Sequence, residues 1–125
     1  MSIVDRIRSE IKAGDIIPKP AAKEDFTVKG WGRSRGKAAL VYYIPSHTHP
    51  DKPSTKRVTD ADFEATYDRL VGNREFTRQW FQERLPVCAG DGDCNFTTIG
   101  GIFILLELAE YVGDGVYRLK AGVKA

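Results

Sequence analysis

The sequence predicts one small α+β domain with about four helices and a two- to three-stranded antiparallel sheet. Its 125 residues are the length of a single domain. Apolar residues recur at helical spacing in four segments, while three other segments alternate apolar and polar residues or form apolar runs. The order is one helix, two strands, three helices and one strand, which is typical of the α+β class.

Clusters of Gly, Pro and Asp separate these segments and predict their boundaries. We expect a single domain over 1–125. Its segments are an N-terminal helix at 2–13, a connector at 14–24, strands with a basic loop at 25–45, a loop at 46–58, a helical pair at 59–85, a loop at 86–96, a core helix at 97–112 and a terminal strand at 116–120.

Capping residues predict where two of the helices begin. Thr59 is followed three residues later by Asp62, the spacing of a capping box. Gly72 and Asn73 predict a left-handed turn at the end of that helix. Thr97 or Thr98 is expected to cap the core helix, which is apolar on nearly every side.

The C-terminal half resembles winged helix-turn-helix domains. Residues 60–71 and 77–85 form two short helical segments with helix-turn-helix proportions. The core helix is followed by the turn Gly113-Asp114-Gly115 and a short strand, which is similar to a wing. The resemblance implies a winged-helix-like fold and a DNA-binding role, in which the second short helix would read base edges. The side chains that would face the groove are Thr77, Arg78, Gln79 and Gln82.

The strongest functional lead is a cluster of cations between residues 29 and 37. Lys29, Arg33, Arg35 and Lys37 occur there without an acidic residue, and Trp31 lies among them. Lys and Arg neutralise phosphates, and an exposed Trp can stack on a base. The sequence therefore predicts contact with nucleic acid or another anion. The alternative is a solvated hairpin loop whose tryptophan packs over the sheet.

Three further cations are predicted to extend this basic patch from the C-terminal half. They are Arg74, Arg78 and Arg118.

Composition excludes some functional classes. The chain has 19 Lys and Arg against 17 Asp and Glu, a formal net charge of +2. This balance excludes a histone-like tail and an acidic solvating protein, but it neither requires nor excludes a nucleic-acid partner. No apolar run approaches the roughly 20 residues of a membrane span. The N-terminus also lacks the pattern of a secretory signal. We therefore expect a cytoplasmic protein with no membrane partner.

The histidines and cysteines do not have the spacing of a metal site. His47 and His49 lie far in sequence from Cys88 and Cys94, and neither pair forms the short knuckle of a zinc finger. We expect no metal and no cofactor, and cysteines that stay reduced in the cytoplasm.

Known catalytic motifs are absent from the sequence, so it does not decide whether the protein is an enzyme and predicts no catalytic residue. The leading hypothesis is a small cytoplasmic binding module that contacts nucleic-acid backbone through the basic Gly/Trp loop. The alternative is a protein-interaction or accessory protein, potentially a homodimer, with no nucleic-acid role. Many aromatic residues fit that alternative equally well.

Overall fold

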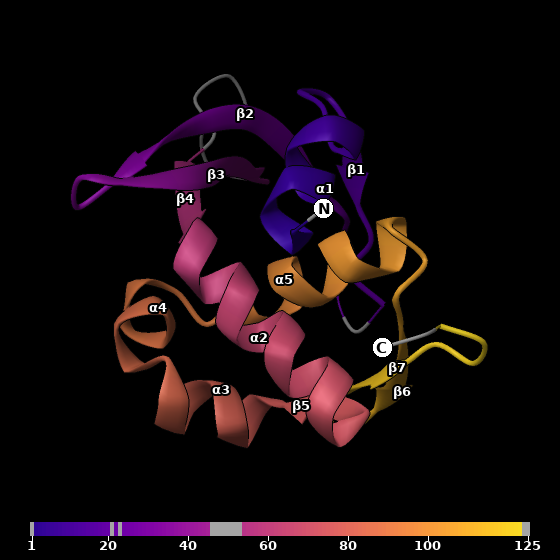
Figure 1. Ribbon diagram of the computed structural model, residues 1–125. Coiled ribbons are helices and arrows are strands. Elements are labelled where there is room, and N and C mark those ends of the chain that lie inside the picture. Colours follow the sequence, from indigo (N-terminus) through magenta and orange to yellow (C-terminus); the bar gives the residue numbers. More distant parts are fainter. Residues whose placement is uncertain (1, 21, 23, 46–53, 124–125) are drawn as a thin grey trace.

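Five helices and seven strands make up the part of the chain that the computed structural model describes, residues 2–20, 22, 24–45 and 54–123. Figure 1 shows their arrangement. In chain order they are α1 (Ile3–Glu10), β1 (Ile16–Ile17), β2 (Phe26–Ser34), β3 (Lys37–Ile44), β4 (Ser54–Thr59), α2 (Asp60–Asn73), β5 (Glu75–Thr77), α3 (Arg78–Arg84), α4 (Pro86–Asp91), α5 (Cys94–Leu105), β6 (Ala109–Gly113) and β7 (Val116–Leu119).

The N-terminal sheet is antiparallel with strand order β1-β2-β3-β4. Its centre is the hairpin of β2 and β3, in which Ser34 pairs with Lys37. Arg35 and Gly36 form the two-residue turn, with φ angles of 51° and 76°. Positive φ at both turn residues is the backbone of a type I′ turn, which suits the twist of a hairpin. The turn carries Arg35 to the outer end of the hairpin.

A second antiparallel sheet has the order β5-β7-β6, and α5 packs between the two sheets. Eight of its twelve residues are buried. Two glycines allow the close approach: a Cβ at Gly100 would lie 2.2 Å from the ring of Tyr117 in β7, and one at Gly101 would lie 2.5 Å from Ile17 in β1. This explains why a core helix contains two adjacent residues of low helix propensity.

An aromatic cluster fills the core around α5 and the three-stranded sheet. The ring of Phe76 stacks on that of Tyr117 at 5.2 Å, and it meets Phe96 and Phe103 edge to face. Phe63 of α2 joins the cluster through Phe103. These large fully buried rings connect α2, α5 and the second sheet into one core.

The α+β class is confirmed, and the strand at 116–120 is confirmed as β7. The prediction of a single small sheet is wrong, because the described strands form one sheet of four strands and one of three. Two strands arise where irregular structure was predicted: β1 inside the connector at 14–24, and β4 inside the predicted loop at 46–58. Both are held by pairing with another strand, β1 with β2 and β4 with β3, and local periodicity does not carry this signal. Residues 46–53 lie outside the described residues.

The predicted basic loop is largely strand. β2 continues through Gly30, Trp31 and Gly32 to Ser34, with a bulge between Val28 and Gly30. Glycines in a strand often mark such a bulge. Gly30 and Gly32 therefore belong to the strand and do not form the predicted loop.

One helix forms where a loop was predicted, and the predicted bounds of the core helix are wrong. Residues 86–91 form α4, which begins with Pro86, a residue favoured at the first helical position. The core helix spans 94–105 and not 97–112, because Glu107 adopts a φ of 60° and the chain then enters β6. Thr97 and Thr98 lie inside α5 and do not cap it.

The remaining helices lie close to their predicted positions. The first helix ends at Glu10, since Ile11 is already extended. Thr59 and Asp62 form the predicted capping box of α2. The left-handed residue that ends α2 is Arg74, with a φ of 66°. The helical pair is separated by β5 and not by a tight turn alone.

Candidate functional site: a basic cleft beside the hairpin

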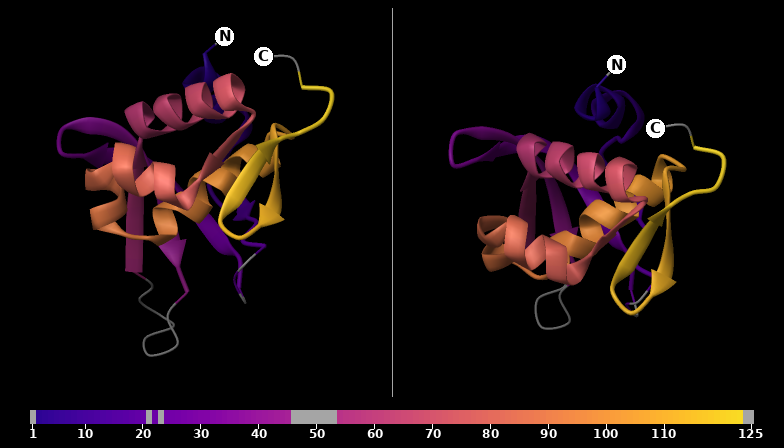
Figure 2. Two further views of the ribbon diagram at one scale, coloured as in Figure 1. Left: turned by 90° about the horizontal axis from the view of Figure 1, so that it is seen from below. Right: turned by 60° about the horizontal axis from the view of Figure 1, so that its bottom comes forward.

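The hairpin and β4 of the N-terminal sheet contain basic residues but no acidic ones. The described residues of the β2–β3 hairpin, including its turn, and of β4 carry six basic side chains and no Asp or Glu. Figure 1 and Figure 2 show the outer end of the hairpin at the edge of the molecule, on the side where α4 lies. All six cations lie on the hairpin and β4. They are Lys29, Arg33, Arg35, Lys37, Lys56 and Arg57.

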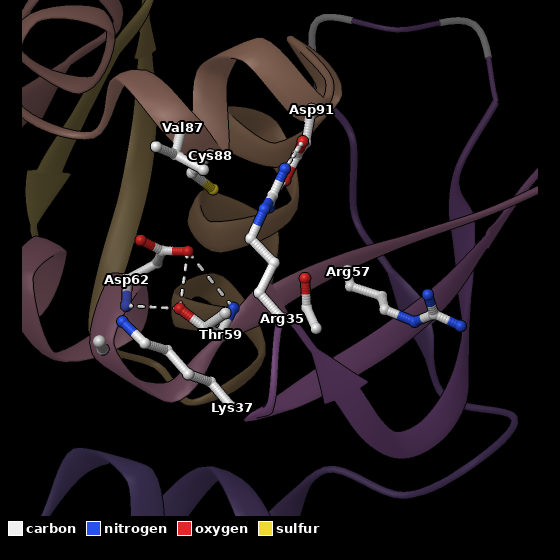
Figure 3. A pocket seen from close by; sticks show the side chains of 10 residues that line it. Arg35, Lys37, Arg57, Thr59, Asp62, Val87, Cys88 and Asp91 are labelled. Atoms are coloured by element: carbon white, nitrogen blue, oxygen red, sulfur yellow. Dashed lines mark hydrogen bonds and ion pairs between the residues drawn. The ribbon is translucent and has the colours of Figure 1, made fainter.

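A cleft opens between the end of the hairpin, β4 and helix α4 (Figure 3). One part has a volume of about 230 Å³ and reaches down to Thr59, Asp62 and Cys88. An adjoining part, of about 350 Å³, runs along β4. Arg35 and Arg57 line both parts. In Figure 3, Lys37 points toward Thr59 and Asp62, whereas Arg57 points away from the other labelled side chains.

Asp91, at the end of α4, binds two of the cations. Its carboxylate accepts two hydrogen bonds from Arg35, at 2.6 and 2.8 Å. Its backbone carbonyl accepts a third from Nζ of Lys56 at 2.7 Å. The hydrogen bond from Arg35 holds the pKa of the Asp91 carboxyl below its usual value. Asp91 therefore remains ionised at neutral pH.

The floor of the cleft is formed by the capping box of α2 and a buried thiol. The Asp62 carboxylate accepts hydrogen bonds from the hydroxyl of Thr59 at 2.8 Å and from its backbone N–H at 3.4 Å, as part of the capping box. Burial, and next the Asp62 carboxylate, raise the pKa of the Cys88 thiol well above its ordinary value. A thiol that stays protonated is a poor nucleophile. The cations that line the cleft are side chains that can bind an anion.

The structure brings together only part of the predicted site. Arg33, Arg35 and Lys37 all lie at the end of the hairpin, where Arg33 donates to the carbonyl of Gly36 at 2.9 Å. Lys29 lies further along β2, with its Nζ 5.8 Å from the centre of the Tyr43 ring.

Trp31 does not project freely from the sheet. It pairs with the buried Leu40 and is half-buried against the core. The guanidinium of Arg8, from α1, lies 4.2 Å from the centre of its ring. One face of the indole is therefore already covered, as in the alternative interpretation of this residue.

Two of the other predicted cations, Arg74 and Arg118, lie at the opposite end of α2. Fourteen residues of helix span about 21 Å, so Arg74 lies about that far from Thr59. The carbonyl of Arg74 accepts from the N–H of Leu119, and Arg118 pairs across the sheet with Glu75 and Glu110. Arg78 forms an ion pair with Asp93 at 2.6 Å. These three cations do not join the hairpin cluster.

The predicted recognition helix corresponds to α3. Gln79 and Gln82 are exposed on it, but Gln79 donates to Glu83 at 3.1 Å. Thr77 caps the helix by accepting from the backbone N–H of Trp80. Contacts within the protein therefore engage Thr77, Arg78 and Gln79, three of the four side chains predicted to face the groove.

Sequence reasoning missed Lys56, Arg57 and Asp91. The first two are adjacent cations in a segment predicted to be a loop, and the β-branched residues Thr55, Val58 and Thr59 could have indicated the strand. Asp91 lies in a second segment predicted to be a loop, at 86–96. Its contact with Arg35 joins residues 56 positions apart and leaves no local pattern.

No metal-binding group emerges from the described residues, where no three His, Cys, Asp or Glu side chains converge. Cys88 and Cys94 are free thiols. His47 and His49 lie outside the described residues. None of the helices in the described part of the chain has the length and apolarity needed to cross a membrane.

Comparisons of this chain with protein-family models, with curated proteins and with solved structures found no match.

Proposed function

We propose that this protein binds nucleic acid through its phosphate backbone, using the β2–β3 hairpin and β4. One observation carries the proposal: the described residues of the hairpin, including its turn, and of β4 carry six cations and no acid. Binding of a polyanion releases its condensed counterions, which is the main source of affinity for such a surface. The small overall charge of +2 shows how strongly cations are concentrated here relative to the whole chain.

The shape of the hairpin supports this assignment. A two-stranded ribbon fits the major groove of DNA, and its outer turn carries Arg35. Trp31 is half-buried and the guanidinium of Arg8 covers one face of its ring. We therefore do not assign base stacking to this residue. Contacts to phosphate position a protein without reading sequence. We therefore expect binding that depends little on base sequence.

The winged-helix interpretation of the C-terminal half belongs to this proposal. It is supported by the order of α2, β5, α3 to α5 and the hairpin of β6 and β7, with β5 pairing to β7. However, α5 is buried at eight positions, and the turn between β6 and β7 carries the acid Asp114. Neither element suits contact with phosphates, so we assign that contact to the N-terminal hairpin.

Salt dependence tests the proposal directly. A labelled mixed-sequence DNA duplex is titrated with the protein, and its fluorescence anisotropy is followed at about 50 and 200 mM salt. Three or four phosphate contacts predict a loss of affinity of roughly 40- to 150-fold between these conditions. The absence of binding at the lower salt concentration would overturn the proposal.

A matched pair of variants locates the contact. Arg33→Gln with Arg57→Gln removes two cations from the hairpin and β4. Arg74→Gln with Arg118→Gln removes two from the other end of the molecule, so both variants lower the net charge equally. We expect the first pair to weaken binding and to reduce the salt slope by about one unit per cation. The second pair should change the affinity little. Equal effects of the two pairs would show that net charge, and not the hairpin, governs binding.

The protein-interaction alternative makes a different prediction. It expects no salt-dependent DNA binding, and a mass above that of one chain if the partner is a second copy. Sedimentation velocity of the same samples, with and without DNA, separates these two functions.

A further inference from the structure

Arg35, one of the cations of the cleft, already binds an internal carboxylate with the geometry in which it would bind a phosphate. Arg35 donates two hydrogen bonds to the two carboxylate oxygens of Asp91, at 2.6 and 2.8 Å. A guanidinium presents the same planar pair of donors to a carboxylate and to a phosphate. We propose that Arg35 and its neighbours form a phosphate subsite that Asp91 masks. This inference rests on the proposed function and adds an internal competitor to it.

The surroundings of this ion pair are those of an anion site. The adjoining cavity of about 350 Å³ is lined by three cations, two hydroxyl groups and a single acid. Asp91 is that acid, so its carboxylate occupies the position of the ligand. The lining residues are Ser34, Arg35, Thr55, Lys56, Arg57 and Asp91.

The mask is reversible because the ion pair is exposed. The side chain of Arg35 is 60% exposed and that of Asp91 is 37% exposed. Exposed ion pairs contribute little to stability and are screened by salt. A phosphodiester that also contacts neighbouring cations can therefore displace the Asp91 carboxylate. The contact from Lys56 goes to the backbone carbonyl of Asp91 and does not depend on its side chain.

Removing the competing charge tests the mask. Asp91→Asn keeps the shape of the side chain and the backbone carbonyl but no longer neutralises Arg35. We expect this variant to bind the labelled duplex about fivefold more tightly at 50 mM salt, the upper end for one exposed ion pair. The salt slope should also rise by about one, because one more cation contacts phosphate.

Asp93→Asn is the matched control. Asp93 lies two residues away, is exposed, and pairs with Arg78. The substitution changes the net charge equally but frees no cation of the cleft, so it should alter affinity less than twofold. Equal gains from the two variants would overturn the mask, since net charge alone would then explain both.

A double variant identifies the cation that gains the contact. Adding Arg35→Gln to Asp91→Asn should abolish the gain, because the released guanidinium is then missing. A gain that survives in the double variant would contradict the assignment of Arg35. If the Arg33/Arg57 pair weakens binding while Asp91→Asn has no effect, the masking inference fails and the proposed function stands. If neither wild type nor Asp91→Asn binds at 50 mM salt, both fail.

Discussion

The ammonium Nζ of Lys19 lies 2.7 Å from the hydroxyl Oγ1 of Thr98 inside the protein. Two more acceptors complete its surroundings, Oγ1 of Thr97 at 2.8 Å and the carbonyl of Cys94 at 3.1 Å. The ring of Phe26 lies 4.0 Å from the same nitrogen. Lys19 is only 3% exposed. This side chain ties the segment between β1 and β2 to the first turns of α5.

Burial of Lys19 predicts that stability increases with pH. Burial lowers the pKa of its amine from 10.5 to about 7. Between these values the unfolded chain binds a proton that the folded chain does not, so the free energy of unfolding rises with pH. Below about pH 7 both states are protonated and the slope vanishes. From pH 6 to 8 this one group should add about 1.4 kcal/mol.

Urea unfolding of a matched pair isolates this effect. Lys19→Met should lose the increase between pH 6 and 8, because no titrating amine remains at that position. Lys12→Met removes an exposed lysine and should keep the wild-type pH dependence. Parallel pH profiles for wild type and Lys19→Met would show that the buried amine does not titrate in this range.

Gly100→Ala should destabilise the protein strongly. The added Cβ would lie 2.2 Å from the ring of Tyr117, which is fully buried and stacked on Phe76. Overpacking of this kind costs about 3 kcal/mol. Gly72→Ala, near the end of α2, meets nothing within 4 Å and should stabilise by about 0.5–1 kcal/mol. Thermal and urea unfolding of the two variants should therefore shift in opposite directions.

Tyr42→Phe should disconnect three elements of the core. The hydroxyl of Tyr42, on β3, donates to Oδ1 of Asn95 at 2.6 Å, and Asn95 donates to the carbonyl of Cys88 at 2.9 Å. Loss of the hydroxyl leaves a buried acceptor on Asn95 without this donor, at a cost of about 1–3 kcal/mol. Tyr67→Phe, at a half-buried ring packed on Phe103, should change stability by less than about 0.5 kcal/mol. Equal midpoints for the two variants would contradict the network.

Thr59→Ala tests the start of α2. The hydroxyl of Thr59 accepts from the N–H of Asp62 at 3.2 Å and donates to its carboxylate at 2.8 Å. Removal of a capping side chain costs about 1 kcal/mol. Thr59→Ser retains the hydroxyl and should recover most of that loss in urea unfolding. A serine variant as unstable as the alanine variant would point to packing of the methyl group and not to the cap.

Local signals account for the parts of the fold that the sequence predicted. The capping box at Thr59 and Asp62 involves residues three apart, so it can be recognised in one window of sequence. The strand at 116–119 alternates apolar and polar residues after a glycine turn. The cluster of cations at 29–37 is likewise local in sequence, and Arg33, Arg35 and Lys37 remain together because one hairpin carries them.

Contacts between distant segments account for what the sequence missed. The strand β4 exists because Val58 pairs with Leu40 across the sheet, and this pairing overrides a segment that looks irregular. The burial of Lys19 depends on hydroxyls 78 and 79 residues away. A lysine between two prolines gives no sign of burial, because its surroundings come from another part of the chain.

The sequence by itself determined the class of fold, the start of α2, the final strand and the presence of a basic segment, because each depends on residues close together in the chain. Only the tertiary structure decided which charges meet. It placed Lys56 and Arg57 beside the hairpin, set Asp91 against Arg35 and separated Arg74 and Arg118 from them by the length of α2. Electrostatic interactions depend on distance in space, and that distance follows from strand pairing and helix packing.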